Sequence, residues 1–367
     1  MSEVVAAVGS VAVESLHEQQ GHNNVQSFID DLKIALKKNP QPVNKHALKN
    51  WHTSSLTTAM LRRIQGFATG MQRRSTYIRS QEMVWLEGGN PNGEPLVLVH
   101  GFASSKENWI LLLPFLTRRY RVFVPDLPGW GESTFQYGEP YGIEEQIARF
   151  DDWAERYLPV QFHLVGSSMG GGLGALYTAQ HPKRVLSLTL MNALGVAGPQ
   201  KTPFEEGLHQ GHNALIAHRL SDVVRMMSTV TSHHRWVLTA MLVPLMYQEL
   251  VMRRHVNTHM FHELLDRAPS GIFDGIADIS CPTLVLWGEK DQILHASCAQ
   301  VFQEMIPHAD VKILKSVGHL PMVEVPGQTA RALLHFWRQT AAKSAIAKIT
   351  GAQSADVTAQ ADEVVVA

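Results

Sequence analysis

The chain has 367 residues, of which 45% are hydrophobic and 18% charged, a balance typical of a globular protein long enough for one large domain and an insertion. Its formal net charge of −1 argues against a nucleic-acid partner, because duplex binding usually leaves a strongly basic surface. Two cysteines, Cys281 and Cys298, are too few for a disulfide framework and lack metal-ligand spacing. We therefore expect two buried, reduced thiols and a cytoplasmic protein; one bridge between them is the alternative.

Residues 1–80 are predicted to form a helical N-terminal extension. Residues 25–38 carry apolar side chains at helical spacing, and Pro40 and Pro42 end this pattern. Residues 56–74 combine an apolar side with several arginines, and such a segment can associate peripherally with an anionic membrane. The alternative is a helix that packs on the main domain. The first residues lack the basic region of a signal peptide, and we expect no membrane-spanning helix.

From residue 81 onward, strand patterns alternate with helical patterns, which predicts an α/β core over residues 81–197 and 275–345. Most of the strand patterns are continuously apolar, as in parallel strands buried on both faces. The alternation predicts a mostly parallel central sheet with helices on both faces. Strands are predicted at residues 82–87, 96–99, 122–124, 162–165, 185–190 and 283–286, and helices at 143–157, 169–181 and 296–305.

The alternation breaks over residues 198–274, which are helical in pattern and which we interpret as an inserted cap. Its methionines either form an adaptable apolar surface over a site or fill the core of the cap. His255, His259 and His262 fall on one helix face, but no carboxylate or cysteine completes a familiar ligand set, so we expect neither a metal site nor a cofactor. Residues 346–367 are predicted to be a flexible tail.

The strongest motif is Gly166-Ser167-Ser168-Met169-Gly170, a G-x-S-x-G pattern between an apolar strand and a predicted helix. This is the context of a nucleophile elbow, in which the serine occupies a tight, strained turn. The glycines are needed because side chains at their positions would collide with neighbouring elements. The motif therefore predicts Ser168 as a nucleophile held near the positive end of a helix dipole.

A serine hydroxyl needs a neighbouring base to become nucleophilic at neutral pH. Asp291 and His319 each follow a late predicted strand, at the sheet edge where α/β folds build their sites. The order serine, acid, histidine is the one expected with this elbow. We predict His319 as the general base and Asp291 as the acid that orients it, with Glu289 as the competing acid.

An oxyanion needs donors as well, and the loop after residues 96–99 begins His100-Gly101-Phe102. The backbone N–H of Phe102 is expected to pair with that of Met169 to form an oxyanion hole. His100 is interpreted as a buried, hydrogen-bonded histidine that supports this loop.

Together with Asp126-Leu127-Pro128-Gly129-Trp130-Gly131-Glu132-Ser133, Gly288-Glu289-Lys290-Asp291 and Gly318-His319, these motifs resemble the α/β-hydrolase superfamily over roughly residues 81–340. The motifs are most similar to those of monoacylglycerol-lipase-like enzymes and bacterial lipases or esterases. The resemblance implies an α/β-hydrolase fold with its helical cap between strands 6 and 7. It also implies hydrolysis of a small, hydrophobic carboxylic ester through an acyl-enzyme on Ser168.

Three alternatives stay open at this point. Carbon–carbon hydrolases of ring-cleavage products usually have Asn before the nucleophile and Trp after the catalytic histidine, whereas this chain has Ser167 and Leu320. Cofactor-free perhydrolases or haloperoxidases share the Ser-Met pair of the elbow. A non-catalytic binding protein would be expected to lack a triad member. The sequence does not determine the oligomeric state.

Overall fold

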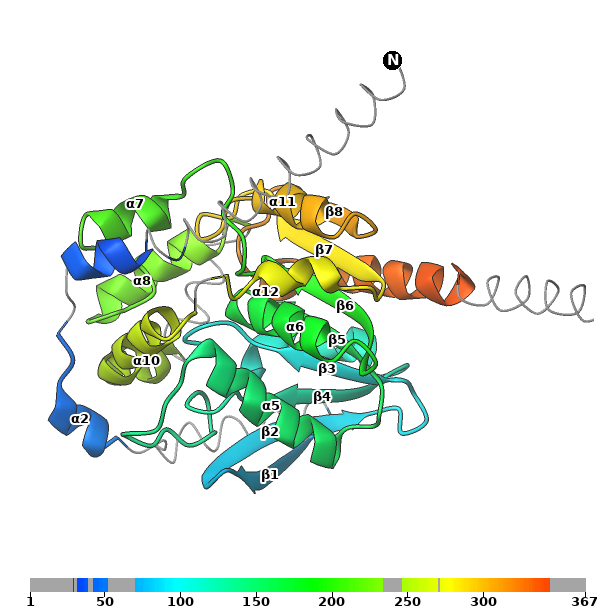
Figure 1. Ribbon diagram of the computed structural model, residues 1–367, viewed down its shortest axis with the longest axis horizontal. Helices are drawn as coiled ribbons and strands as arrows, with labels where there is room; N and C mark the ends of the chain where they lie inside the picture. The colour runs from blue at the N-terminus through cyan, green and yellow to red at the C-terminus, as the bar shows by residue number, and fades with distance from the viewer. Residues whose placement is uncertain are drawn as a thin grey trace, which may run out of the picture.

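The chain forms one eight-stranded sheet in the order β1-β2-β4-β3-β5-β6-β7-β8, which contains the predicted strands and an additional edge strand, β1 (Figure 1). The structure is a computed structural model that describes residues 29, 32–38, 42–51, 70–233, 246–269 and 271–343. β2 pairs antiparallel with β1 and with β4, and the other neighbours are parallel. The strands are β1 Gln72–Ile78, β2 Gln81–Gly89, β3 Pro95–Val99, β4 Arg121–Pro125, β5 Phe162–Ser167, β6 Val185–Met191, β7 Thr283–Gly288 and β8 Asp310–Leu314.

Both faces of the sheet are covered, which explains why the central strands are continuously apolar. Side chains alternate between the faces of a strand, so in β3 Leu96 and Leu98 join one buried cluster while Val97 and Val99 join another. Figure 1 shows α5 and α6 across one face. Helices on the two faces include η1 Lys106–Trp109, α4 Leu113–Leu116, α5 Ile143–Tyr157, α6 Met169–Gln180, α11 Cys298–Met305, α12 Pro321–Glu324 and the helix at residues 326–343.

A group of helices separates β6 from β7 along the chain, in agreement with the predicted cap position. These helices gather at one side of the sheet, and the N-terminal helix within residues 32–38 lies against them (Figure 1, blue). The short helix α2 Lys45–Lys49 follows it and contacts α10. The cap contains α7 Pro203–His209, α8 Leu220–Val230, the π-helix η2 Gln248–Met252 and α10 Arg254–Asp266. The 3₁₀-helix η3 Asp274–Asp278 follows it and contacts α6 of the core.

Two expectations for the N-terminal part need comment. The helical extension does not reach residue 80, because residues 72–78 form the edge strand β1, whose register with β2 is continuous. The helical pattern at residues 25–38 is confirmed where the chain is described, at residues 29 and 32–38. The proposed membrane segment at residues 56–74 and the tail at 346–367 lie largely or wholly outside the described residues. Cys281 and Cys298 are free and buried, as expected.

Candidate active site

Ser168 occupies the turn between β5 and α6 with φ +54° and ψ −121°, a strained conformation for a residue with a Cβ. The glycines around it are required sterically. A Cβ on Gly166 would lie 2.1 Å from the carbonyl oxygen of Gly170, and one on Gly170 would lie 2.4 Å from that of His100. The turn is held by the Ser168 N–H, which donates to the Met191 carbonyl at 3.0 Å. The predicted nucleophile elbow is therefore present.

Asp291 and His319 form a buried pair beyond the ends of β7 and β8. His319 Nδ1 lies 2.7 Å from Asp291 Oδ2, and the other carboxylate oxygen accepts the N–H groups of Ile293 at 2.8 Å and Leu294 at 3.1 Å. Because a carboxylate only accepts, Nδ1 carries the proton and Nε2 is left as the basic nitrogen. Glu289, the competing acid, is exposed and accepts the Ser316 N–H at 3.1 Å.

Asn192, which the sequence patterns did not single out, connects the elbow to this pair. Its side-chain amide donates to Asp291 Oδ2 at 2.7 Å and to the Gly318 carbonyl at 3.4 Å. It follows Met191 at the end of β6 and has φ +46°, a region that asparagine tolerates better than most residues. The residue after β6 therefore helps to hold Asp291, the partner of His319, in place.

The structure brings all three predicted triad residues to the same edge of the sheet, but it joins only two of them directly. Among the described residues, no hydrogen bond links Ser168 Oγ to the imidazole of His319. Catalytic hydrogen bonds are often long or poorly aligned outside the Michaelis complex. The connection runs through the chain after β6, because the Leu194 N–H donates to the Ser168 carbonyl at 2.9 Å while Asn192 binds Asp291.

Glu324, in α12, holds the loop that carries His319, and it too was missed from the sequence. Its carboxylate accepts the N–H groups of Gly318 at 3.0 Å and Leu320 at 3.3 Å, the two neighbours of the histidine. It also accepts those of Ser232 and His233, both at 2.7 Å, just after α8 in the cap. Burial raises the pKa of this carboxyl, and the four N–H donors oppose that shift. One side chain thus fastens the histidine loop to the cap.

The expected oxyanion donors lie beside the elbow. Phe102 follows β3, Met169 begins α6, and neither N–H donates to another described residue. A Cβ on Gly101 would lie 3.0 Å from the Ser168 Cβ, so the loop passes directly against Ser168. The Phe102 ring packs edge-on against Phe261 of the cap at 5.4 Å.

His100 supports this loop, in agreement with its interpretation as a structural histidine. It is fully buried, its Nε2 accepts the Leu127 N–H at 3.0 Å, and its Nδ1 donates to the Gly101 carbonyl at 2.8 Å. Burial lowers the pKa of the imidazole, which keeps it neutral as this bonding requires. Lys106, which is also buried, binds both carboxylate oxygens of Asp126. Its side-chain amine donates to Oδ2 at 2.7 Å, and its backbone N–H donates to Oδ1 at 2.7 Å.

A small chamber of about 60 Å³ opens on Ser168. Its walls are apolar except for the serine itself, because core, cap and N-terminal residues close around it. The lining residues are Leu32, Phe102, Ser168, Met169, Leu194, Phe204, Leu215, Phe261, Leu264, Leu265, Ile293 and Leu294. An apolar chamber against a nucleophile suits the acyl group of an ester rather than a charged substrate.

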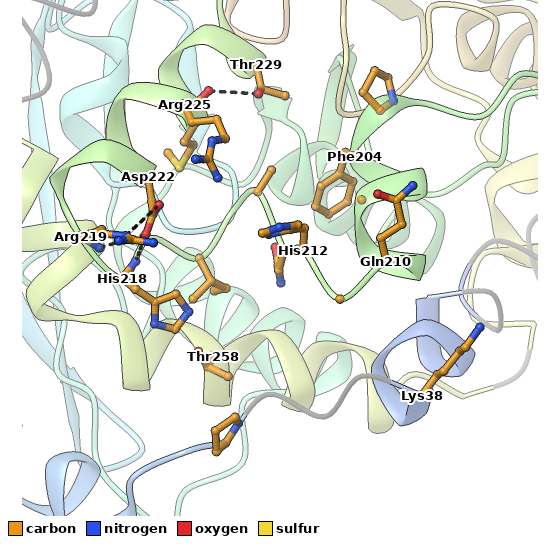
Figure 2. A pocket seen from close by; sticks show the side chains of 18 residues that line it. Lys38, Phe204, Gln210, His212, His218, Arg219, Asp222, Arg225, Thr229 and Thr258 are labelled. Carbon is orange, nitrogen blue, oxygen red and sulfur yellow. Dashed lines mark hydrogen bonds and ion pairs between the residues drawn. The ribbon is translucent and has the colours of Figure 1, made fainter.

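A second cavity, of about 900 Å³, lies in the cap and shares the Phe204 side chain with the chamber (Figure 2). Its lining is more polar and includes His212, Arg225 and, from the N-terminal helix, Lys38. Figure 2 shows Arg219 paired with Asp222 at its edge, a contact of 3.8 Å.

Within the described ranges, no three histidine, cysteine or acidic side chains are placed to hold a metal ion, and His255, His259 and His262 are half-buried along α10. None of the helices in the described part of the chain combines the length and apolar character needed to cross a bilayer.

Comparison with known proteins agrees with this geometry. Residues 96–332 match the model of a family described as "Alpha/beta hydrolase family". The chain is 31% identical over 256 residues to lipase 1 of Psychrobacter immobilis, covering 70% of this chain and 80% of the relative. It is 28% identical over 283 residues to monoacylglycerol lipase abhd6-B of Xenopus laevis, covering 73% and 83%.

Solved structures give a similar result. A membrane phospholipase A, described as a bacterial virulence factor, superposes with a TM-score of 0.72 at 31% identity, over 77% of this chain and 91% of that one. The lip1 protein of Acinetobacter baumannii AYE superposes with a TM-score of 0.65 over 80% and 99% of the two chains, and at 23% identity it bears on the fold alone.

Proposed function

The chain belongs to the alpha/beta hydrolase family, and on that premise we propose the residues that carry its chemistry. It is a serine hydrolase that cleaves ester bonds, as its lipase relatives indicate. Ser168 is the nucleophile, His319 the general base and Asp291 the acid that orients the base. The observation that carries this assignment is the strained elbow at Ser168 together with the buried 2.7 Å pair of His319 and Asp291.

The geometry supports acyl transfer in two steps. His319 Nε2 takes the proton from Ser168 Oγ as the oxygen attacks the ester carbonyl, and Asp291 stabilises the resulting imidazolium. The Phe102 and Met169 N–H groups receive the developing oxyanion, where each such donor typically contributes about 3–4 kcal/mol. The imidazolium then protonates the leaving alcohol. Water, activated by the same histidine, releases the acid from the acyl-enzyme.

The substrate is a small-molecule lipid ester, and we propose a hydrophobic acyl group in the chamber against Ser168. Carbon–carbon hydrolysis and peroxide chemistry are not favoured. The solved 2-hydroxy-6-oxo-6-phenylhexa-2,4-dienoate hydrolase from Rhodococcus sp. strain RHA1 is 18% identical and shares the fold alone. Ser167 and Leu320 depart from the pattern expected of carbon–carbon hydrolases.

Three finer points stay proposals. A cytoplasmic location is supported by the two free, buried cysteines, which suit a reducing compartment. Peripheral membrane contact rests on the basic pattern within residues 56–74. The division into extension, core, cap and tail is supported by the helical insertion between β6 and β7.

A matched pair of serine variants tests the assignment. Ser168→Ala should abolish hydrolysis of p-nitrophenyl butyrate and labelling by a fluorophosphonate probe. Ser167→Ala is the control, because that buried hydroxyl precedes the nucleophile and makes no hydrogen bond within the described residues. The control should keep both properties. Turnover by Ser168→Ala at the wild-type rate would end the proposal.

A further inference from the structure

The N-terminal helix is built into the molecule although it lies outside the matched region, residues 96–332. Ile29, Leu32 and Leu36 are each 5% exposed and Ala35 is 1% exposed, a spacing that places them on one helix face. The face packs into the same buried cluster as the cap helices. The Lys33 amine donates to the carbonyl of Ala268, just after α10, at 3.2 Å.

Of this buried face, Leu32 alone lines the chamber that contains Ser168. Leu264 and Leu265 of α10 line the chamber as well, and they lie close in sequence to Ala268, which binds Lys33. The N-terminal helix is therefore held to the cap where it forms part of the chamber wall. The chamber is about 60 Å³, whereas an engineered protein cavity of about 150 Å³ takes up a benzene molecule. The Leu32 side chain therefore occupies space that a longer acyl group would need.

The same helix also borders the larger cavity in the cap. Lys38 lies at the rim of that cavity of about 900 Å³, beside the segment that carries Phe204 and Gln210 (Figure 2). Phe204 lines both cavities. An acyl chain that grows past Phe204 therefore reaches a much larger space.

We propose that Leu32, contributed by the N-terminal extension, is a specificity-determining residue that limits the length of the acyl group bound against Ser168. This proposal rests on the proposed ester hydrolysis. It makes the extension part of the substrate site rather than an appendage, and it predicts that the wild-type enzyme prefers short acyl chains.

The test uses full-length Leu32→Ala with Leu36→Ala as its matched control. Both changes truncate a leucine that is 5% exposed on the same helix, one turn apart, but Leu36 does not line the chamber. The measurement is kcat/KM for p-nitrophenyl acetate, butyrate, hexanoate and octanoate. Leu32→Ala should raise the octanoate-to-butyrate ratio by about tenfold or more, since one methylene in an apolar pocket is typically discriminated about 10–200-fold. Leu36→Ala should leave the ratio unchanged.

Leu32→Phe provides a second variant in the opposite direction, with an expected loss of hexanoate and octanoate turnover relative to acetate. Fluorophosphonate labelling of each variant separates this proposal from the assignment of the nucleophile. Labelled Leu32 variants with the wild-type chain-length profile would overturn the role of Leu32 and leave the hydrolase intact. An equal shift in Leu36→Ala would overturn it too, because helix loosening would then be the cause. If the assignment of Ser168 as nucleophile were wrong, the Ser168→Ala variant would still hydrolyse the ester.

Discussion

Replacing Glu324 with glutamine hardly changes the volume of the side chain, but it turns one of the two hydrogen-bond acceptor oxygens into an NH₂ donor. The carboxylate accepts four backbone N–H groups. The N–H groups of Ser232 and His233 both donate to one oxygen at 2.7 Å, and the Gly318 N–H is shared between the two oxygens at 3.0 and 3.1 Å. The amide oxygen of glutamine should take the position that Ser232 and His233 share. Its NH₂ group then faces the Leu320 N–H, which lies 3.3 Å from the other oxygen in the wild type, and the Gly318 N–H, which keeps one of its two acceptors.

The expected cost follows from these contacts. A buried donor left without an acceptor costs about 1–3 kcal/mol, and the remaining bonds weaken because charge-assisted hydrogen bonds are about twice as strong as neutral ones. We expect a loss of about 2–4 kcal/mol in total. Since Gly318 and Leu320 flank His319, the loop should relax away from Asp291. If the change raises the activation free energy of the reaction by about 1.4 kcal/mol, kcat drops about tenfold.

The assay is hydrolysis of p-nitrophenyl butyrate at pH 8, together with thermal unfolding. Glu324→Gln should lower kcat by about tenfold or more with little change in KM. It should also lower Tm by about 5 °C or more, given about 2–4 °C per kcal/mol for domains of 150–250 residues. Glu289→Gln is the control, because that exposed glutamate accepts one N–H, from Ser316. Wild-type kcat and Tm in Glu324→Gln, or equal damage in the control, would refute the reasoning.

Two further predictions concern Asn192, which binds Asp291, and His100, which supports the loop beside Ser168. Asn192→Gly suits the positive φ of that position and removes one hydrogen bond to the buried Asp291 carboxylate, worth about 1.5–3 kcal/mol, so kcat should fall about 10–100-fold in steady-state assays; an unchanged kcat would show that Asn192 has no positioning role. Burial lowers the pKa of His100, so the unfolded chain binds more protons below about pH 6.5, and Tm should fall as the pH drops through and below that value. His100→Gln keeps an acceptor for the Leu127 N–H but does not titrate, so it should flatten this fall, and a slope equal to the wild type would contradict the assignment. Burial also lowers the pKa of His163, His255 and His259, and these histidines contribute to the slope that remains.

Much of the fold was predictable because its signals are local. The predicted helix at residues 143–157 coincides with α5, and the predicted strands differ from the observed ones by one or two residues at their ends. The exception is β1. Its residues are mostly exposed in an edge strand, so the burial pattern that marks the other strands is missing. Pairing with β2, rather than its own pattern, makes it a strand.

The amino-acid sequence by itself determined the elbow and the order of the three catalytic candidates. Glycine spacing and a strand before a helix are properties of a few adjacent residues, and parallel strands bring their carboxyl ends to one edge. Only the tertiary structure shows that Asp291, and not Glu289, pairs with His319, because the pairing depends on which carboxylate the fold brings to the imidazole. It alone identified Asn192 and Glu324, whose contacts join residues 99 and 92 positions apart. Leu32 likewise reaches Ser168 only through folding, since side-chain packing between distant segments leaves no periodic trace along the chain.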